Sequence, residues 1–321
     1  MHVSSSSVVV LAAGKGTRMK SKTPKVLHSL CGRTLLGHAL HAAKGIAPEH
    51  IVAVVRHERD AVAAEAQRVI PDVIIADQDD IPGTGRAVQC ALISAKENGV
   101  DLGDTVLVTS GDVPLLESAT LQKVLEAHVD ASAAVTAVTT IAPDPTGYGR
   151  IVRDGEAIAR IVEQRDASTE ERGINEINAG IYAFDREFLE EALRGLGTDN
   201  DQGEVYLTDI VEIAATAGRL AQPYVLEDTW QAEGCNDLVQ LATLRRVLNT
   251  RLCEHHMRQG VSIVDPVTTS LDVDVVLEAD SRIEPFTTVR GHSIVRSGAT
   301  VGPYVVIEDL EVTPGSTMDA G

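Results

Sequence analysis

The sequence predicts a doubly wound α/β domain with a mostly parallel sheet, then a helical linker and a short left-handed parallel β-helix. Three observations support this: short apolar strands alternating with helices, one long amphipathic helix, and an aliphatic residue at every sixth position near the end. Strands that alternate with helices are typical of a parallel sheet covered on both faces. The 321 residues exceed one domain of usual size, so two domains are expected.

The first expected strand, residues 7–11, reads S-V-V-V-L, a β-branched run that suits a strand buried on both faces. The alternating elements that follow are expected as helices at 34–44, 59–69 and 86–98 and as strands at 51–55, 73–76 and 105–109. In such a sheet ligands bind beyond the carboxyl ends of the strands. The looser strands from residue 133 to 184 are interpreted as a lid over the substrate.

The last part of the chain repeats with a different period. The aliphatic positions are Leu271, Leu277, Ile283, Val289, Val295, Val301 and Ile307. A six-residue spacing is typical of a left-handed parallel β-helix, in which each such residue points into the core. The spacing ends near 308–311, so only about two and a half coils are expected, and the domain is interpreted as truncated or stabilised by a neighbour. The expected domains are 1–234, a linker helix at 235–260, and 261–321.

The net charge of −19 argues against nucleic acid and anionic membranes as partners, because both require a basic surface. No acidic residue precedes Glu49, however, whereas seven Lys and Arg residues do, which indicates a local anion site. The four cysteines have no metal-ligand spacing and are interpreted as free thiols. The apolar run at 8–13 is too short to span a bilayer and does not resemble a signal peptide, so a cytoplasmic protein is expected.

The strongest local motif is L-A-A-G-K-G-T-R-M at Leu11–Met19, followed by Pro24-Lys25. Its glycines allow backbone N–H groups to approach a phosphate, and Arg18 and Lys25 supply positive charge. A Walker A loop is excluded because Gly16 follows Lys15. A dinucleotide fingerprint is excluded because Met19 stands where it requires glycine.

Six further motifs accompany this loop, in the order Q-D-D-I-P-G-T-G at 78–85, G-D-V-P-L-L at 111–116, G-Y-G-R-I at 147–151, I-V-E-Q-R-D-A at 161–167, E-I-N-A-G-I-Y at 176–182 and E-V-Y-L-T-D at 204–209. Together they resemble the family of bifunctional N-acetylglucosamine-1-phosphate uridyltransferase / glucosamine-1-phosphate N-acetyltransferase enzymes of bacterial cell-wall synthesis. The resemblance covers essentially the whole chain. It implies a Rossmann-like nucleotidyltransferase domain that uses Mg²⁺.

The resemblance also implies roles for individual residues. It implies that Arg18, Lys25 and Asp112 are catalytic and that Asp112 and Asn236 bind magnesium. Nucleotide contacts fall to Leu11, Ala12, Ala13, Gly14, Lys25, Gln78, Gly83, Thr84, Ser110 and Gly111, and sugar contacts to Gly149, Glu163, Asn178 and Asn236. The implied reaction joins UTP to N-acetylglucosamine 1-phosphate, releasing pyrophosphate and UDP-N-acetylglucosamine. The family forms homotrimers, and its acetyl-CoA site lies in coils beyond residue 321, so acetyl transfer is not expected here.

Simpler interpretations stand beside these roles. Asp112 could cap a turn, Glu163 could be an exposed strand carboxylate, Asn178 a strand-end amide, and Asn236 the N-cap of the long helix. Three other functions are also considered: a pyrophosphorylase for another sugar or base, a sugar-nucleotide-binding module without turnover, and an acyltransferase built on the repeats.

Overall fold

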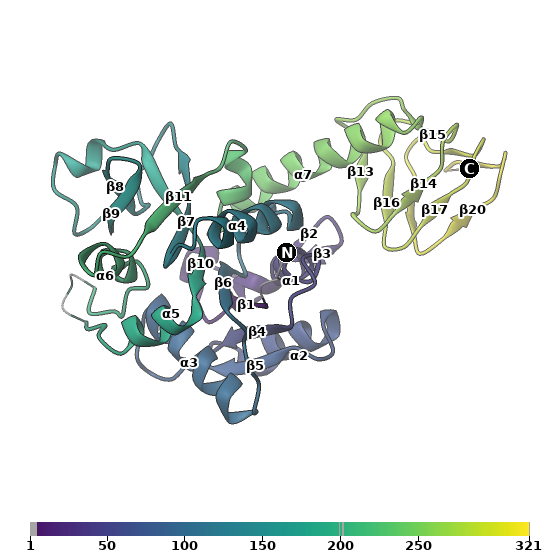
Figure 1. The fold of residues 1–321 in the computed structure, drawn as a ribbon. Helices are drawn as coiled ribbons and strands as arrows, with labels where there is room; N and C mark the ends of the chain where they lie inside the picture. The colour runs from purple at the N-terminus through teal and green to yellow at the C-terminus, as the bar shows by residue number, and fades with distance from the viewer. Residues whose placement is uncertain (1–4, 199, 201, 321) are drawn as a thin grey trace. The chain divides into compact units, whose positions relative to one another are not determined.

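The computed structural model describes residues 5–198, 200 and 202–320. The described chain forms two compact units. The first unit comprises the described parts of 1–27 and 35–234, and the second comprises 28–34 and 235–320 (Figure 1). Each unit has its own apolar core, so each is described by itself.

A single sheet organises the first unit, in the order β11-β7-β10-β6-β1-β4-β5. Its strands are β1 (Ser6–Leu11), β4 (His50–Val55), β5 (Ile74–Asp77), β6 (Thr105–Ser110), β7 (Val135–Ile141), β10 (Glu176–Asp185) and β11 (Ala221–Val225). The strands β5, β4, β1 and β6 pair in parallel, and β10 lies antiparallel between β6 and β7. The hairpin of β8 (Arg150–Asp154) and β9 (Ala157–Val162) branches from β10. The predicted mixed α/β fold with a mostly parallel sheet is confirmed.

Strand β1 explains why the sheet is covered on both sides. Val8, Val9 and Val10 are all fully buried. Val8 and Val10 belong to one core and Val9 to the other, because successive side chains of a strand point to opposite faces. Helices α1 (Leu35–Lys44), α2 (Arg59–Val69) and α4 (Ser118–Asp130) contribute to the first core, and α3 (Thr84–Glu97), α5 (Arg186–Leu193) and α6 (Asp209–Thr216) to the second.

Helix α7 (Leu238–Arg258) opens the main part of the second unit. Asp237 is its N-cap, and its carboxylate accepts hydrogen bonds from the backbone N–H groups of Val239 and Gln240. The interpretation of Asn236 as the cap is therefore wrong, because the next carboxylate already satisfies the orphan donors of the first turn. Along this predicted amphipathic helix Leu241 and Leu244 are buried, whereas Leu238 is 51% exposed.

Short parallel strands complete the second unit and form three sheets, β12-β15-β18-β21, β13-β16-β19 and β14-β17-β20. Their bounds are β12 Ser262–Ile263, β13 Ser270–Leu271, β14 Val276–Leu277, β15 Arg282–Ile283, β16 Thr288–Arg290, β17 Ile294–Val295, β18 Thr300–Val301, β19 Val306–Glu308, β20 Glu311–Val312 and β21 Thr317–Met318. All seven predicted aliphatic positions are buried. The repeat then shortens by one residue, because Val312 takes the inward position that pairs with Val295. This arrangement is compatible with a β-helix.

One segment differs from the expected domain boundaries. Residues 28–34 form the hairpin β2 (Ser29–Leu30) and β3 (Arg33–Thr34), which belongs to the second unit. The Nε of Arg33 donates to Asp274 at 3.1 Å, and the N–H of Val273 donates to the carbonyl of Cys31 at 3.0 Å. These contacts join residues about 240 positions apart in the chain, so local sequence patterns do not reveal them.

None of the described helices combines the length and apolarity that crossing a membrane requires.

Candidate functional site

A cavity of about 530 Å³ opens in the first unit at one edge of its sheet. Leu11 and Ser110 end β1 and β6, and Arg56 and Gln78 directly follow β4 and β5, and all four line the cavity. The four parallel strands therefore direct their carboxyl ends toward one space, which is where open α/β sheets bind ligands.

The predicted site residues divide into those that line this cavity and those that do not. The lining includes Leu11, Ala13, Gly14, Gln78, Gly83, Thr84, Ser110, Asp112, Gly149, Glu163 and Asn178. Ala12, Lys25 and Gly111 are not among the lining residues. The N–H groups of Ala12 and Gly111 donate to the carbonyls of Val54 and Leu11. Arg18, on the short helix η1 (Thr17–Met19), is exposed and also outside the lining. Asn236 belongs to the second unit.

Lys25 and Asp112 form an ion pair at the cavity. Both side chains are only 14% exposed, and the hydroxyl of Ser110 donates to the other carboxylate oxygen at 2.6 Å. Gly16 has a φ of +62°, and a Cβ there would lie 2.4 Å from the Cβ of Lys25. Glycine at this position therefore gives Lys25 room to pack beside the loop, in addition to permitting its left-handed backbone.

Three basic side chains that the sequence did not assign to the site also line the cavity. They are Lys15, Arg56 and His57. Burial lowers the pKa of His57 below its ordinary value, and the positive charges of Arg56 and Lys15 lower it further. The same positive charge favours an anionic ligand. Lys15 was recognisable as part of the basic start of the chain, whereas Arg56 and His57 reach the site only because β4 lies beside β1.

The loop after β5 is held by its own polar groups. The amide nitrogen of Gln78 donates to the carbonyls of Ile81 and Gly83 at 3.0 and 3.1 Å. Gly83 has a φ of +118°, and a Cβ there would lie 2.2 Å from the carbonyl oxygen of Val205. The hydroxyl of Thr84 accepts a hydrogen bond from the N–H of Leu207 at 3.2 Å. This loop therefore cannot accept a side chain at residue 83 without moving its neighbour.

The opposite wall of the cavity carries Gly149, Glu163 and Asn178. Gly149 lies beside both of the others: a Cβ there would be 3.5 Å from the Glu163 carboxylate and 3.6 Å from the Cβ of Asn178, and 3.1 Å from the Cγ2 of Ile161. Burial raises the pKa of Glu163 above its ordinary value, although a long hydrogen bond of 3.4 Å from Thr208 opposes the shift. The Asn178 amide donates to the hydroxyl of Tyr182 at 2.6 Å, which fixes its orientation.

Several wall residues were not predicted. Tyr148, Tyr182, Glu204 and Thr208 all line the cavity. Burial raises the pKa of Tyr148 to about 12, and the nearby charge of Glu233, to which its hydroxyl donates at 3.1 Å, contributes. Tyr148 lies between the two glycines of G-Y-G-R-I, so its motif was a usable signal.

Asp112 has the chemistry that a magnesium ligand requires, since a carboxylate is a hard oxygen donor. Among the described residues no group of three or more His, Cys, Asp or Glu side chains could hold a metal ion together. Mg²⁺ bound to a nucleotide keeps several waters and usually needs only one or two protein carboxylates. The residues of the cavity thus fit a Mg²⁺ that arrives with phosphates.

Comparison with known proteins defines the family. Residues 8–176 match the model of the MobA-like NTP transferase domain. The "Bifunctional protein GlmU" of Kineococcus radiotolerans is 50% identical over 98% of this chain, and that of Bifidobacterium longum subsp. infantis is 43% identical over 98%. A nucleoside-diphosphate-sugar pyrophosphorylase structure from Vibrio cholerae RC9 shares the fold with a TM-score of 0.59 at 18% identity, covering 75% of this chain and 99% of that one.

The chain spans 63% of the length of the Kineococcus protein and 68% of the Bifidobacterium protein. The match to these proteins includes both units, and the match to the domain model lies in the described sequence from β1 to the start of β10. The chain therefore belongs to the family of the bifunctional protein GlmU and carries its NTP transferase domain.

Proposed function

We propose that the first unit transfers a uridylyl group from UTP to N-acetylglucosamine 1-phosphate, producing UDP-N-acetylglucosamine and pyrophosphate. The observation that carries this proposal is the Lys25–Asp112 pair, whose carboxylate lines the cavity at the strand ends, while the far wall holds a half-buried carboxylate, Glu163. The end of the cavity with Lys25 and Asp112 suits phosphates with a metal ion, and the end with the Glu163 carboxylate and the Asn178 amide suits the hydroxyls and amide of a sugar.

A phosphate oxygen of the sugar phosphate attacks the α-phosphorus of UTP, and the bond from that phosphorus to pyrophosphate breaks. The nucleophile is already an anion, so the site needs no general base. Lys25, Lys15 and Arg18 supply positive charge near the phosphates, and the main contribution of the protein is position and charge neutralisation.

When bound, Mg²⁺ would offset the negative charge of the phosphates. Asp112 of the first unit would hold it. Because Lys25 already pairs with Asp112, the carboxylate is oriented before any ligand enters. Ser110 supports the same orientation.

The proposed uridine subsite comprises Gln78, Gly83 and Thr84 with the backbone of residues 11–14. Both donor contacts of the Gln78 amide go to loop carbonyls, so its carbonyl oxygen is the end that a pyrimidine N–H would use. The proposed sugar subsite comprises Gly149, Glu163 and Asn178. There the carboxylate accepts from sugar hydroxyls and the amide contacts the N-acetyl group.

Pyrophosphate release tests the proposal. The full chain with Mg²⁺, UTP and N-acetylglucosamine 1-phosphate is expected to release pyrophosphate, and glucose 1-phosphate or dTTP is expected to be a much poorer substrate. Asp112→Ala is expected to lower the rate by roughly 10²–10³-fold, whereas Asp72→Ala, on an exposed turn, keeps it. UTP binding without pyrophosphate release would instead identify a binding module, and preference for glucose 1-phosphate would refute the proposed specificity.

For the second unit we propose a left-handed parallel β-helix over 261–321, preceded by a linker helix at 235–260. The paired strands of its central coils lie eighteen residues apart, as in Ser270 with Thr288 and Thr288 with Val306, which corresponds to three hexapeptides per coil. Circular dichroism of the isolated repeat would not resolve its hand, so an experimental structure is the appropriate test.

A further inference from the structure

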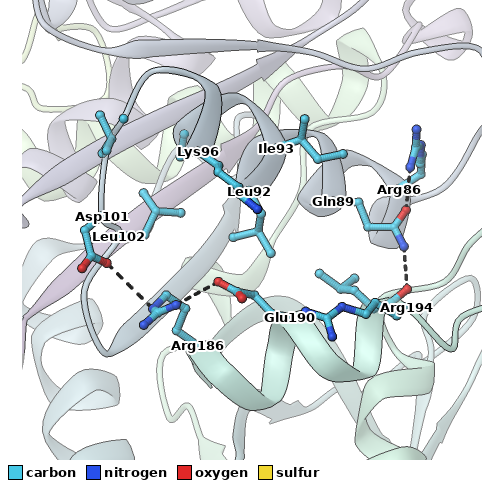
Figure 2. A pocket seen from close by; sticks show the side chains of 14 residues that line it. Arg86, Gln89, Leu92, Ile93, Lys96, Asp101, Leu102, Arg186, Glu190 and Arg194 are labelled. Atoms are coloured by element: carbon cyan, nitrogen blue, oxygen red, sulfur yellow. Dashed lines mark hydrogen bonds and ion pairs between the residues drawn. The ribbon is translucent and has the colours of Figure 1, made fainter.

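A second cavity, of about 700 Å³, lies in the first unit between helices α3 and α5 (Figure 2). None of the motif residues assigned to substrates lines it. Its inner wall is apolar, with Leu102 and Leu193 only 4% and 3% exposed. Ile93, on the α3 side, adds an apolar surface that is 47% exposed.

The rim of this cavity is cationic. Arg186 is neutralised locally, because it pairs with Glu190 at 2.9 Å and lies 4.0 Å from Asp101. Arg86 pairs with Asp79. Lys96 and Arg194 also line the cavity, and no ion pair joins either of them to another residue in the described part of the chain.

Two uncompensated cations over an apolar wall are notable in a chain of net charge −19. The negative field of distant carboxylates is screened within about 8 Å at physiological salt, so the nearby cations decide which ligand is favoured. An inorganic anion alone would leave the apolar wall in contact with water. An uncharged apolar molecule would leave the cations without a partner.

We propose that this cavity binds a small organic anion with an apolar body, with its acidic group between Lys96 and Arg194 and its body against Ile93 and Leu193. The volume lies within the range of about 300–1,000 Å³ that is typical of small-molecule sites.

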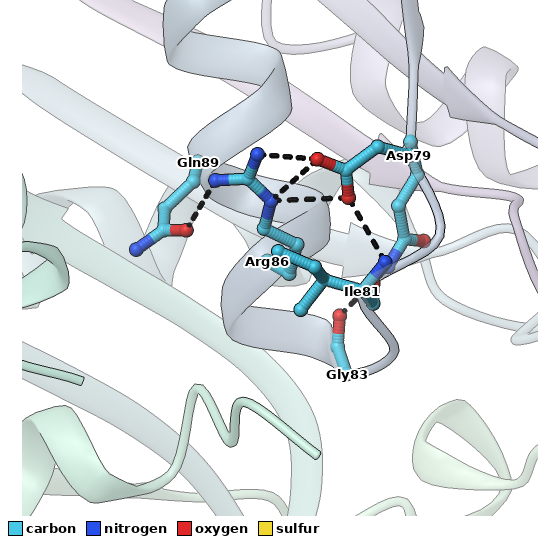
Figure 3. Close-up of polar contacts among 6 residues, drawn as sticks. Asp79, Ile81, Gly83, Arg86 and Gln89 are labelled. Carbon is cyan, nitrogen blue, oxygen red and sulfur yellow. Dashed lines mark hydrogen bonds and ion pairs between the residues drawn. The ribbon is translucent and has the colours of Figure 1, made fainter. Parts of the chain in front are cut away.

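Arg86 connects this cavity to the loop of the nucleotide site (Figure 3). Its guanidinium pairs with Asp79 and donates to Gln89 at 2.9 Å, and Gln89 donates to the carbonyl of Leu193 at 2.6 Å. Asp79 in turn accepts from the N–H of Ile81, in the loop that Gln78 holds. A ligand that moves the cavity wall would therefore also act on that loop, and this linkage to UTP binding rests on the proposed function.

The binding proposal is tested with two dyes of the same shape: 1-anilinonaphthalene-8-sulfonate, an apolar anion, and N-phenyl-1-naphthylamine, which lacks the sulfonate. Fluorescence titration of the full chain compares the wild type with Lys96→Gln/Arg194→Gln. The double variant is expected to weaken sulfonate binding roughly three- to tenfold while leaving the neutral dye unchanged. The matched control is Lys123→Gln/Arg68→Gln, which removes two exposed cations elsewhere on the same unit.

Unchanged sulfonate binding in the double variant would overturn the proposal, as would an equal loss in the control. A second variant, Ile93→Asn, tests the apolar wall at a position that is 47% exposed. This variant is expected to weaken the binding of both dyes. Unchanged binding of both would show that the dyes bind elsewhere and would refute the proposed cavity.

The linkage is tested by repeating the sulfonate titration with saturating Mg²⁺ and UTP. By reciprocity, a change in dye affinity must equal the change in UTP affinity caused by the dye. A shift of at least about twofold in Kd is expected, and Arg86→Gln is expected to abolish it. UTP that binds without any shift would contradict the linkage. Failure of UTP to bind would contradict the proposed function. The dye titrations without nucleotide would still show whether the cavity between α3 and α5 binds an organic anion.

Discussion

The two units differ in what they bury. The first unit buries ionisable side chains wholly or in part, including Arg150, which is 1% exposed, and Glu163, which is half-buried at the cavity. The buried polar residues of the second unit are hydroxyls, namely Thr269, Ser281, Thr287 and Ser293. Burying a charge costs free energy unless it is paired. The first unit therefore carries a desolvation cost at its ionisable groups, and the repeats of the second unit carry almost none.

The largest expected effect is on the rate of pyrophosphate release, which we attribute to the first unit alone. Lys25→Gln removes the cation paired with Asp112, so charge neutralisation at the phosphates is weakened. We expect pyrophosphate release to fall roughly 10²–10³-fold. The matched control is Lys22→Gln, an exposed lysine of the same segment.

Rates are measured at saturating substrates, beside thermal unfolding to verify that the variant is folded. An equal loss of rate in Lys22→Gln would show that the basic segment acts through its overall electrostatic field, and not through the Lys25–Asp112 ion pair.

The second effect concerns stability in the first unit. Burial lowers the pKa of His128 from 6.5 to about 4, although the charge of Asp185 opposes the shift. Below pH 6.5 the unfolded chain binds a proton that the folded chain does not, so stability is complete above this pH and falls as pH decreases toward 4. The loss attributable to His128 is up to about 3 kcal/mol.

Urea unfolding of the wild type and of His128→Gln at pH 7.5 and 5 measures this difference. Between pH 7.5 and pH 5, His128→Gln is expected to lose less unfolding free energy than the wild type. His41→Gln, at an exposed position, is expected to lose as much as the wild type. An equal pH dependence in all three proteins would contradict the assignment.

The sequence was informative where a pattern repeats or stays local. The β-branched run of β1 predicted a strand buried on both faces, and the six-residue spacing predicted the core of the second unit through Ile307. The position of Gly14 at the cavity was also predictable, because the loop 11–19 directly follows strand β1.

What the sequence did not reveal depends on distant pairing. Arg56 and His57 reach the cavity because β4 lies beside β1. The hairpin at 28–34 joins the second unit through Arg33 and Asp274, far apart in the chain. The cavity beside Lys96 and Arg194 arises only when α3 packs against α5, and no motif marks either residue.

The third effect belongs to the second unit alone. Val295 is fully buried in its repeat core and has no polar contact to lose. Val295→Ala removes two methyl groups and is expected to lower the unfolding free energy of this unit by about 2 kcal/mol. Val276→Ala, at a position that is 48% exposed, is the matched control and should cost much less. Both variants are expected to release pyrophosphate at the wild-type rate at 25 °C. A large loss of rate in Val295→Ala would contradict the claim that the first unit acts independently of the second.

The smallest expected effect tests whether the cost in the first unit serves binding. Burial raises the folded-state pKa of Glu163 above its ordinary value of 4.5, so its contribution to stability falls as pH rises through that range, because the unfolded chain ionises first. Glu163→Gln removes this cost, and we expect a higher unfolding temperature at pH 7.5 together with a roughly tenfold rise in KM for the sugar phosphate, since a neutral amide is a weaker acceptor for hydroxyls. Glu204→Gln, on another part of the cavity wall, is the comparison. A Glu163→Gln protein that is less stable with an unchanged KM would mean that the carboxylate supports the fold, and the contrast between the units would then not extend to this wall.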